Sequence, residues 1–182
     1  KYDLESLRAQ IGYVAQKAHM FKGSIKSNIC FGKPEASDEE MHHAARVAQA
    51  SDFISKRENG YLDEIAEDGT NISGGQKQRL SIARVILKKP SLYIYDDSFS
   101  ALDFKTDATL RKALKPEVKN AIFFVVAQRI STIMDSDMII VLDEGQIIGM
   151  GTHAQLLKDC SVYQEIAHSQ LTQKELDDYE RN

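Results

Sequence analysis

The sequence predicts an α/β fold, a parallel sheet into which an α-helical subdomain is inserted. Short apolar runs alternate with helix-like stretches along most of the chain, and this alternation is typical of parallel strands joined by crossover helices. The strand-like runs are continuously apolar, as in strands that are covered on both faces. The stretch 37–88 has helical rather than strand-like patterning, so it interrupts the sheet and indicates the inserted subdomain.

Composition and charge restrict the class of protein. The 182 residues are 42% apolar and 27% charged, as in a soluble globular domain. A net charge of −4 gives no basic field of the kind that nucleic-acid binders carry. The densest apolar run, 122–127, is far shorter than the roughly 20 residues needed to span a bilayer. Cys30 and Cys160 lack metal-ligand spacing and are predicted to be reduced thiols.

The first elements follow from local signals. The run 11–15 is a predicted strand, and it ends at Gln16. A loop-rich segment follows to residue 33, punctuated by glycines and closed by a proline. Ser37, with a glutamate three residues later, forms a predicted capping box that starts a helix.

The stretch 72–79 predicts a turn that opens directly into a helix. Ser73 is the expected N-cap, because its hydroxyl can accept a hydrogen bond from an early helical N–H. Gly74 and Gly75 lack a Cβ, so another molecule can approach their backbone closely. A helix N-terminus of this kind favours anions, phosphate above all.

The second half of the chain continues the strand and helix alternation. The run 91–95 predicts a buried strand that ends at Asp96 and Asp97, and a helix is expected at about 106–114. The strand 121–127 ends at Gln128. A strand at 138–142 then leads through a turn at 143–145 into a hairpin. The tail 153–182 is predicted to be mostly helical, with His153 as the expected helix cap and Tyr163 in a solvated extension.

Polar residues end three of the predicted strands. In a parallel sheet, functional residues gather at the carboxyl ends of strands. In this sequence, the residues at those ends are Gln16, the Asp96–Asp97 pair and Gln128. Asp96 is expected to meet Mg²⁺ through water, since this ion takes few protein carboxylates and keeps several waters. The alternative is an aspartate that only caps a helix. Asp97 stands where a general base could act, although a base misplaced by about an ångström loses on the order of 10²-fold in rate.

Several motifs together resemble the nucleotide-binding domain of an ABC transporter, of the exporter type. They occur in the family's order and spacing over about residues 1–168. The matching segments are the Q-loop at Gln16, the exporter loop at 67–69, the signature at 72–76, the Walker B strand at 92–96 and the D-loop at 100–103. The segments 21–25 and 151–157 also resemble exporter sequences. The resemblance implies a P-loop NTPase-like (RecA-like) fold that binds ATP and Mg²⁺.

Three departures from the family pattern stand beside these matches. The phosphate-binding loop G-x-x-x-x-G-K-[ST] is absent from the chain. The resemblance implies that this loop lies upstream of Lys1, so the fold is expected to be N-terminally truncated. The position of the family's catalytic glutamate holds Asp97, and that of its switch histidine holds Gln128. An amide cannot take up a proton as imidazole does, although it can donate a hydrogen bond.

The family resemblance also implies roles and partners. Its domains pair head to tail around two ATP molecules, and each ATP meets the Walker B strand of one partner and the signature of the other. The residues implied at the ATP sites include Gly74, Gly75, Asp103 and three side chains that are expected to contact nucleotide or Mg²⁺: Ser73, Gln76 and Gln16. Asp97 and Gln128 resemble the degenerate half of a heterodimeric exporter, whose partner is a second, non-identical nucleotide-binding domain.

That reading places the domain at the cytoplasmic face of the cell membrane, joined to an exporter's transmembrane domain and without a nucleic-acid partner. Two alternatives stay open. One is a lineage-specific change in an active homodimer. The other is a soluble ABC-type nucleotide switch without a transport role, for which the upstream reading frame would lack about six apolar spans.

The predicted organisation has three parts. Residues 1–16 and 89–160 form an incomplete ATP-binding core, 17–88 the helical signature subdomain, and 161–182 a C-terminal helical tail. Without the phosphate-binding loop, apolar sheet surface is expected to be uncovered, and residues 1–182 on their own are expected to be marginally stable. For the same reason, tight ATP binding by these residues alone is not expected.

Overall fold

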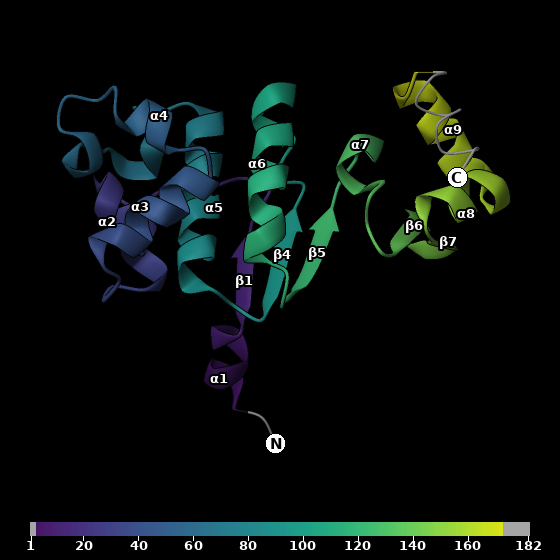
Figure 1. The fold of residues 1–182 in the computed structure, drawn as a ribbon, viewed down its shortest axis with the longest axis horizontal. Helices are drawn as coiled ribbons and strands as arrows, with labels where there is room; N and C mark the ends of the chain where they lie inside the picture. Colours follow the sequence, from purple (N-terminus) through teal and green to yellow (C-terminus); the bar gives the residue numbers. More distant parts are fainter. Residues whose placement is uncertain (1–2, 173–182) are drawn as a thin grey trace. The chain divides into compact units, whose positions relative to one another are not determined.

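The computed structural model describes residues 3–172 and divides the chain into two compact units, residues 1–126 and 127–182. The model is coloured along the sequence in Figure 1. The predicted domain boundaries at residues 16, 88 and 160 stay a prediction. The end of the tail that is predicted to be solvated, 173–182, lies outside the described residues.

A three-stranded parallel sheet forms the centre of the first unit. Its order is β1 (Ile11–Val14), β4 (Leu92–Asp96) and β5 (Ile122–Val126). In register, Tyr13 lies beside Ile94, and Asp96 lies beside the last residue of β5. The parallel sheet and its predicted strands are therefore confirmed.

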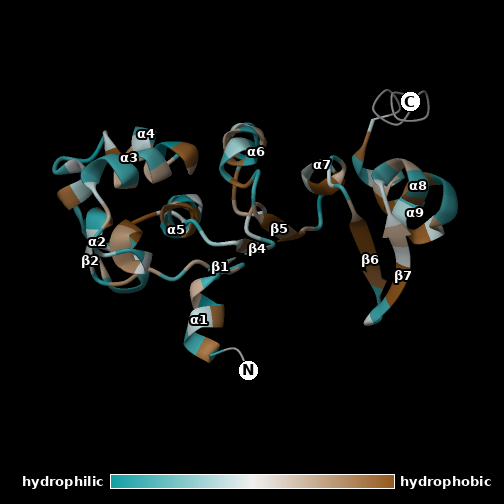
Figure 2. Cartoon of the chain, turned by 60° about the horizontal axis from the view of Figure 1, so that its bottom comes forward, coloured by the Kyte–Doolittle hydropathy of each residue, from teal (hydrophilic) through white to brown (hydrophobic). Residues whose placement is uncertain are grey.

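The two faces of this sheet differ. The face that carries Tyr93 and Tyr95 is buried under α5 (Gly74–Lys88) and α6 (Phe104–Glu117), which lie on the same side of the sheet (Figures 1 and 2). The opposite face exposes Tyr13, Phe124 and other large apolar side chains of β5. The expectation that both faces are covered is thus wrong for the described residues, whereas the expected open apolar surface is present.

The helical part of the first unit packs on α5. It comprises a two-stranded antiparallel pair, β2 (Gly23–Ser24) with β3 (Glu64–Ile65), and short helices whose buried residues join the same hydrophobic core. The helices between these strands are α2 (Ile25–Ile29), α3 (Asp38–Val47) and α4 (Ser51–Ile54), and 3₁₀ turns lie at Cys30–Gly32, Gly60–Leu62 and Glu67–Gly69. The short helix α1 (Leu4–Ala9) precedes β1 and has no buried residue. The predicted capping box at Ser37 is confirmed, because its hydroxyl and the Glu40 carboxylate bond each other's backbone N–H.

The second unit combines a hairpin with three helices. The hairpin is formed by β6 (Ile139–Asp143) and β7 (Gln146–Gly151), as predicted. The helices are α7 (Ile130–Ile133), α8 (His153–Asp159) and α9 (Ser161–Gln170). Figure 2 shows the hydrophobic colour on β6 and β7, and several of their apolar side chains are exposed.

Two predictions for this unit are wrong. Thr152, not His153, caps α8, since its hydroxyl accepts the hydrogen bond from the backbone N–H three residues later. His153 is instead buried, and its Nδ1 lies 2.7 Å from the Tyr163 hydroxyl. Tyr163 is only 2% exposed and belongs to a hydrophobic cluster, so it does not lie in a solvated extension. Helical periodicity identified α9 but not the face that it buries.

Candidate functional site

The carboxyl end of β4 holds the two neighbouring carboxylates. Asp96 is the last residue of the strand, and Asp97 follows with a positive φ of 44°. This left-handed conformation is better tolerated by aspartate than by most residues. The Asp97 backbone N–H donates to the Val126 carbonyl at 2.9 Å, and its own carbonyl accepts from the Ser100 hydroxyl at 2.7 Å. The turn after β4 is therefore fixed by backbone contacts on both sides of Asp97.

A side chain in β1 or just after it contacts each of these carboxylates. The Gln16 amide Nε2 donates to Asp97 Oδ2 at 3.1 Å, so the structure brings together two residues that the sequence singled out. The Tyr13 hydroxyl donates to Asp96 Oδ2 at 2.8 Å. This hydrogen bond, with smaller contributions from desolvation and from the Asp96 charge, raises the pKa of Tyr13.

Tyr13 is not among the residues that the sequence singled out. The alternation of the strand places it on the same face as Ile94 and Asp96 only once β1 and β4 are paired in their observed register. Sequence reasoning treated the run 11–15 as buried strand. The one available signal was a tyrosine hydroxyl in an apolar strand just before a polar strand end.

The chemistry of this strand end fits a magnesium ion. Mg²⁺ binds through one or two carboxylates together with waters and substrate phosphates, so it does not need a dedicated protein cage. Within residues 3–172, no group of three or more His, Cys, Asp or Glu side chains is placed to hold a metal. A carboxylate has about four acceptor positions, so the bond from Tyr13 leaves Asp96 able to accept from metal-bound water.

The N-terminus of α5 is a second polar site in the same unit. The Ser73 hydroxyl accepts from the Gln76 backbone N–H at 3.3 Å, and the Gln76 side-chain oxygen accepts from the Ser73 backbone N–H at 3.0 Å. This capping box confirms Ser73 as the predicted N-cap and α5 as the predicted helix. Ser73 and Gly74 are both exposed, so the end of this helix is accessible to an anion.

At Gly75, the start of α5 lies close to the loop that follows Asp97. A Cβ at Gly75 would lie 3.3 Å from the Ala101 carbonyl oxygen, closer than ordinary contact. The same loop ends at Asp103, which caps α6 by accepting from the Thr106 backbone N–H at 2.9 Å and its hydroxyl at 2.7 Å. These two bonds lower the pKa of the Asp103 carboxyl. Asp103 is therefore an ionised cap beside the signature helix.

Gln78 links the two sites. Its side chain is 1% exposed on α5, and its Nε2 donates to the Ala15 carbonyl at 3.1 Å, directly before Gln16. A buried amide with such a partner fixes the end of β1 relative to α5. The sequence did not single out Gln78 either, because it reads as one more polar residue of an amphipathic helix.

Gln128, the second residue of the predicted catalytic pair, lies in the second unit, whereas Asp97 lies in the first. The Gln128 carbonyl accepts from the Gln170 Nε2 at 2.8 Å, and the same amide's oxygen accepts from the Ile130 backbone N–H at 2.9 Å. The backbone around Gln128 is thus held by the end of α9. Its predicted contact with a γ-phosphate stays a prediction.

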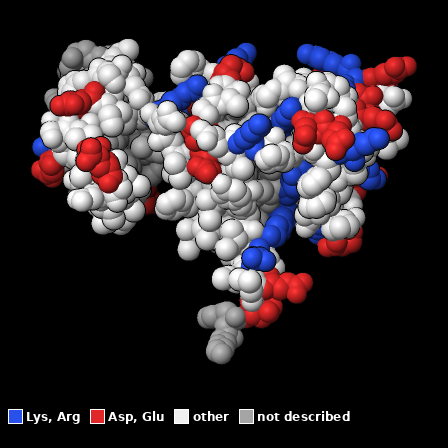
Figure 3. Space-filling model, turned by 180° about the vertical axis from the view of Figure 1, so that it is seen from behind, with Lys and Arg blue, Asp and Glu red and all other residues white. Residues whose placement is uncertain are grey.

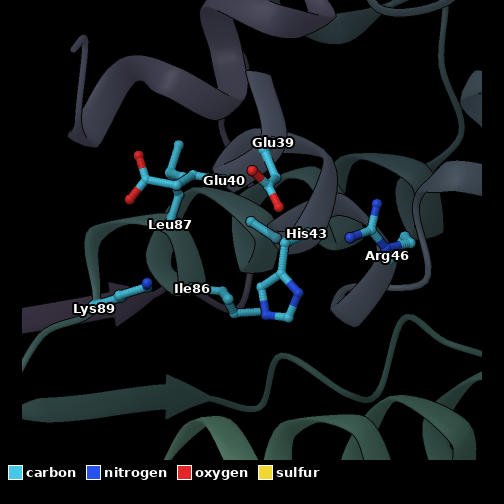
Figure 4. Close-up of a pocket in the computed structure, with 8 residues that line it drawn as sticks. Glu39, Glu40, His43, Arg46, Ile86, Leu87 and Lys89 are labelled. Carbon is cyan, nitrogen blue, oxygen red and sulfur yellow. The ribbon is translucent and has the colours of Figure 1, made fainter. Parts of the chain in front are cut away.

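A charged pocket lies away from these residues, between α3 and the end of α5 (Figure 4). It is lined by Glu39, Glu40, His43, Ala44, Arg46, Ile86, Leu87 and Lys89. Figure 4 shows His43 among them, and its Nε2 lies 2.9 Å from a Glu117 carboxylate oxygen. None of the predicted site residues lines this pocket.

Comparison with known proteins decides the family. The family model described as "ABC transporter" matches residues 1–100. The chain belongs to the ABC transporter family. It is 44% identical over 166 residues to the "Uncharacterized ABC transporter ATP-binding protein YfiB" of Bacillus subtilis, a match that covers 91% of this chain and 29% of that protein. It is 42% identical over 173 residues to a Mycobacterium bovis relative, Mb1304c, with 93% and 29% covered.

A solved structure extends this ABC likeness to the fold. The "Structure of a bacterial Atm1-family ABC exporter with ATP bound" is similar with a TM-score of 0.88 and 38% identity, over 91% of this chain and 29% of that one. The predicted fold class, an ABC exporter-like parallel sheet with a helical insertion, is therefore confirmed. The chain spans less than a third of the length of these relatives.

The described helices and the surface charge of this ABC domain resemble neither a membrane span nor a basic binding face. Over residues 3–172, every helix is too short or too polar to cross a bilayer. On the face seen in Figure 3, Lys and Arg are intermixed with Asp and Glu rather than gathered into one basic field. This mixture agrees with the low net charge.

Proposed function

We propose that this chain is the ATP-binding part of an ABC exporter whose own ATP site hydrolyses poorly. The Gln16 amide bound to the Asp97 carboxylate carries this proposal. It places the shorter acid, where the family has glutamate, in contact with the predicted Q-loop residue. The confirmed family and the exporter neighbour support the assignment to transport.

Each residue has a role in that proposal. Asp96 would hold Mg²⁺ through water, and the ion would neutralise charge that develops on the phosphates. Asp97 accepts a hydrogen bond from Gln16 and would orient water without the reach of a glutamate. Gln128 would donate a hydrogen bond to the γ-phosphate but cannot accept a proton there.

The exposed start of α5 serves the other half of the dimer. Ser73, with Gly74, Gly75 and Gln76, presents a hydroxyl and helical N–H groups to an ATP that a non-identical partner domain holds. Asp103, beside them, would lie at the same interface. The whole protein would include a transmembrane domain and act at the cytoplasmic face of the cell membrane, exporting its substrate.

Nucleotide binding by the full-length protein tests this proposal. Titration with Mg-ATP should give a dissociation constant in the micromolar range, and Asp96→Asn should weaken it, since the carboxylate for Mg²⁺ is lost. Residues 1–182 alone should bind ATP weakly. Absence of Mg-ATP binding to the full-length protein, or micromolar binding to residues 1–182, would contradict the assignment.

A further inference from the structure

The two carboxylates at the end of β4 are each held by a side chain of the neighbouring segment. Gln16 holds Asp97 and is already assigned by resemblance to the Q-loop. Tyr13, three residues earlier, holds Asp96 at the shorter distance of 2.8 Å and has no assigned role. The contact joins residues 83 positions apart in the sequence.

The sheet register explains how this contact forms. Tyr13 lies directly beside Ile94, and Asp96 is two residues further along the same strand. Since side chains alternate across a strand, Tyr13, Ile94 and Asp96 project from one face. A tyrosine is long enough to reach a diagonal neighbour on that face.

Burial does not require this hydrogen bond. Tyr13 is 53% exposed, and a hydroxyl at the surface can bond water instead at little cost. The contact therefore matters for Asp96, because a hydrogen-bond donor to one of its oxygens restrains the orientation of its carboxylate. Partners that orient a metal-binding carboxylate strengthen the binding of the ion.

We propose that Tyr13 is a positioning residue, which holds the Asp96 carboxylate in the orientation that binds Mg²⁺. This inference rests on the proposed function, in which Asp96 is the carboxylate of the metal site. Tyr13 touches neither nucleotide nor ion in this account. Its hydroxyl occupies Oδ2 and leaves the remaining acceptor positions of Asp96 for metal-bound water.

Metal affinity of the full-length protein tests the proposal. Mn²⁺, which substitutes for Mg²⁺ and has an electron-spin signal, is titrated in the presence of ATP. Tyr13→Phe removes only the hydroxyl and should weaken Mn²⁺ binding about 10-fold, the lower end of the loss expected when a metal ligand loses an orienting partner. Tyr93→Phe is the matched control: it makes the same change on the buried face of the sheet and should leave the affinity unchanged.

Asp96→Asn separates failure of this inference from failure of the proposed function. If Asp96→Asn weakens Mn²⁺ binding and Tyr13→Phe does not, Tyr13 has no positioning role and the metal site stands. If Asp96→Asn also has no effect, the metal site and the inference both fall. Tighter binding by Tyr13→Phe would mean that the hydroxyl competes with the ion, and an equal loss in Tyr93→Phe would mean a general effect on the sheet; either result overturns the proposal.

Discussion

The end of β4 and the start of α5 are two polar sites built in opposite ways. At β4, Asp96 and Asp97 depend on Tyr13 and Gln16, partners more than 80 residues away in the sequence. At α5, the capping box closes within three residues. The resemblance implies that the first site departs from the family pattern at Asp97 and that the second keeps Ser-Gly-Gly-Gln. Under the proposed function, the altered site is therefore the one assembled by tertiary contacts, and the intact site is the one that a short local sequence specifies.

Restoring the β4 site should have the largest effect. In the full-length protein, Asp97→Glu combined with Gln128→His should raise ATP turnover about 100-fold, since a base placed an ångström closer gains on this order. Steady-state phosphate release measures the change. The same pair of substitutions together with Asp96→Asn should show no gain, because the metal carboxylate is missing. Equal turnover before and after restoration would show that Asp97 does not limit hydrolysis.

Removing the hydroxyl at α5 should act on the partner's site instead. In the complex with its partner, Ser73→Ala should lower ATP turnover about 10-fold, because a hydrogen bond to a charged phosphate is lost. Ser37→Ala is the matched control, since it breaks the same kind of capping box on α3. Each variant should cost about 1 kcal/mol of stability. An equal loss of turnover in both variants would mean that Ser73 acts only through helix stability.

Substitution of Gln78 tests whether the end of β1 depends on its hydrogen bond to α5. Gln78→Leu keeps the side-chain volume but leaves the Ala15 carbonyl without its donor, at a cost of about 1–3 kcal/mol. Denaturant unfolding measures this loss, and hydrogen exchange should report faster opening of β1 near Gln16. Gln10→Leu, at an exposed position, should change stability much less. Unchanged protection of β1 in Gln78→Leu would separate the two sites.

The second unit provides a smaller, pH-dependent effect. Burial lowers the pKa of His153, and the nearby Asp135 charge opposes this shift. The unfolded chain therefore binds the proton more readily, so stability should fall as pH drops below the ordinary value of about 6.5. Thermal unfolding between pH 7.5 and 5.5 measures the loss. His153→Gln should flatten this dependence, and an unchanged slope would exclude His153 as its source.

What the sequence could predict follows the same division between local and distant contacts. The capping box at Ser37, the N-cap at Ser73, the helix that follows Ser73 and the β6–β7 hairpin depend on residues within a few positions, and all were predicted. The contacts of Tyr13 and Gln78 were not, because they depend on the register between β1 and β4 and on the packing of α5. Periodicity identifies a strand but leaves its neighbour and its register open.

At the start of α8 the local pattern pointed to the right residue. Thr152, followed by Gln155 three residues later, forms a capping box, and the prediction of His153 as the cap overlooked it. The structure places His153 against Tyr163 because α8 and α9 pack on each other, which is a tertiary choice. The family, in contrast, was predicted from motifs in their order along the chain and is confirmed. Such motifs can be recognised without any knowledge of packing.

The central claim is that this chain binds ATP but depends on a non-identical partner for rapid hydrolysis. The most direct test is the ATP turnover of the full-length protein, purified alone and then with its partner chain, at saturating Mg-ATP. The account predicts turnover near background for the protein alone and a large increase when the partner is added. Robust hydrolysis by the protein alone would contradict it and favour an active homodimer.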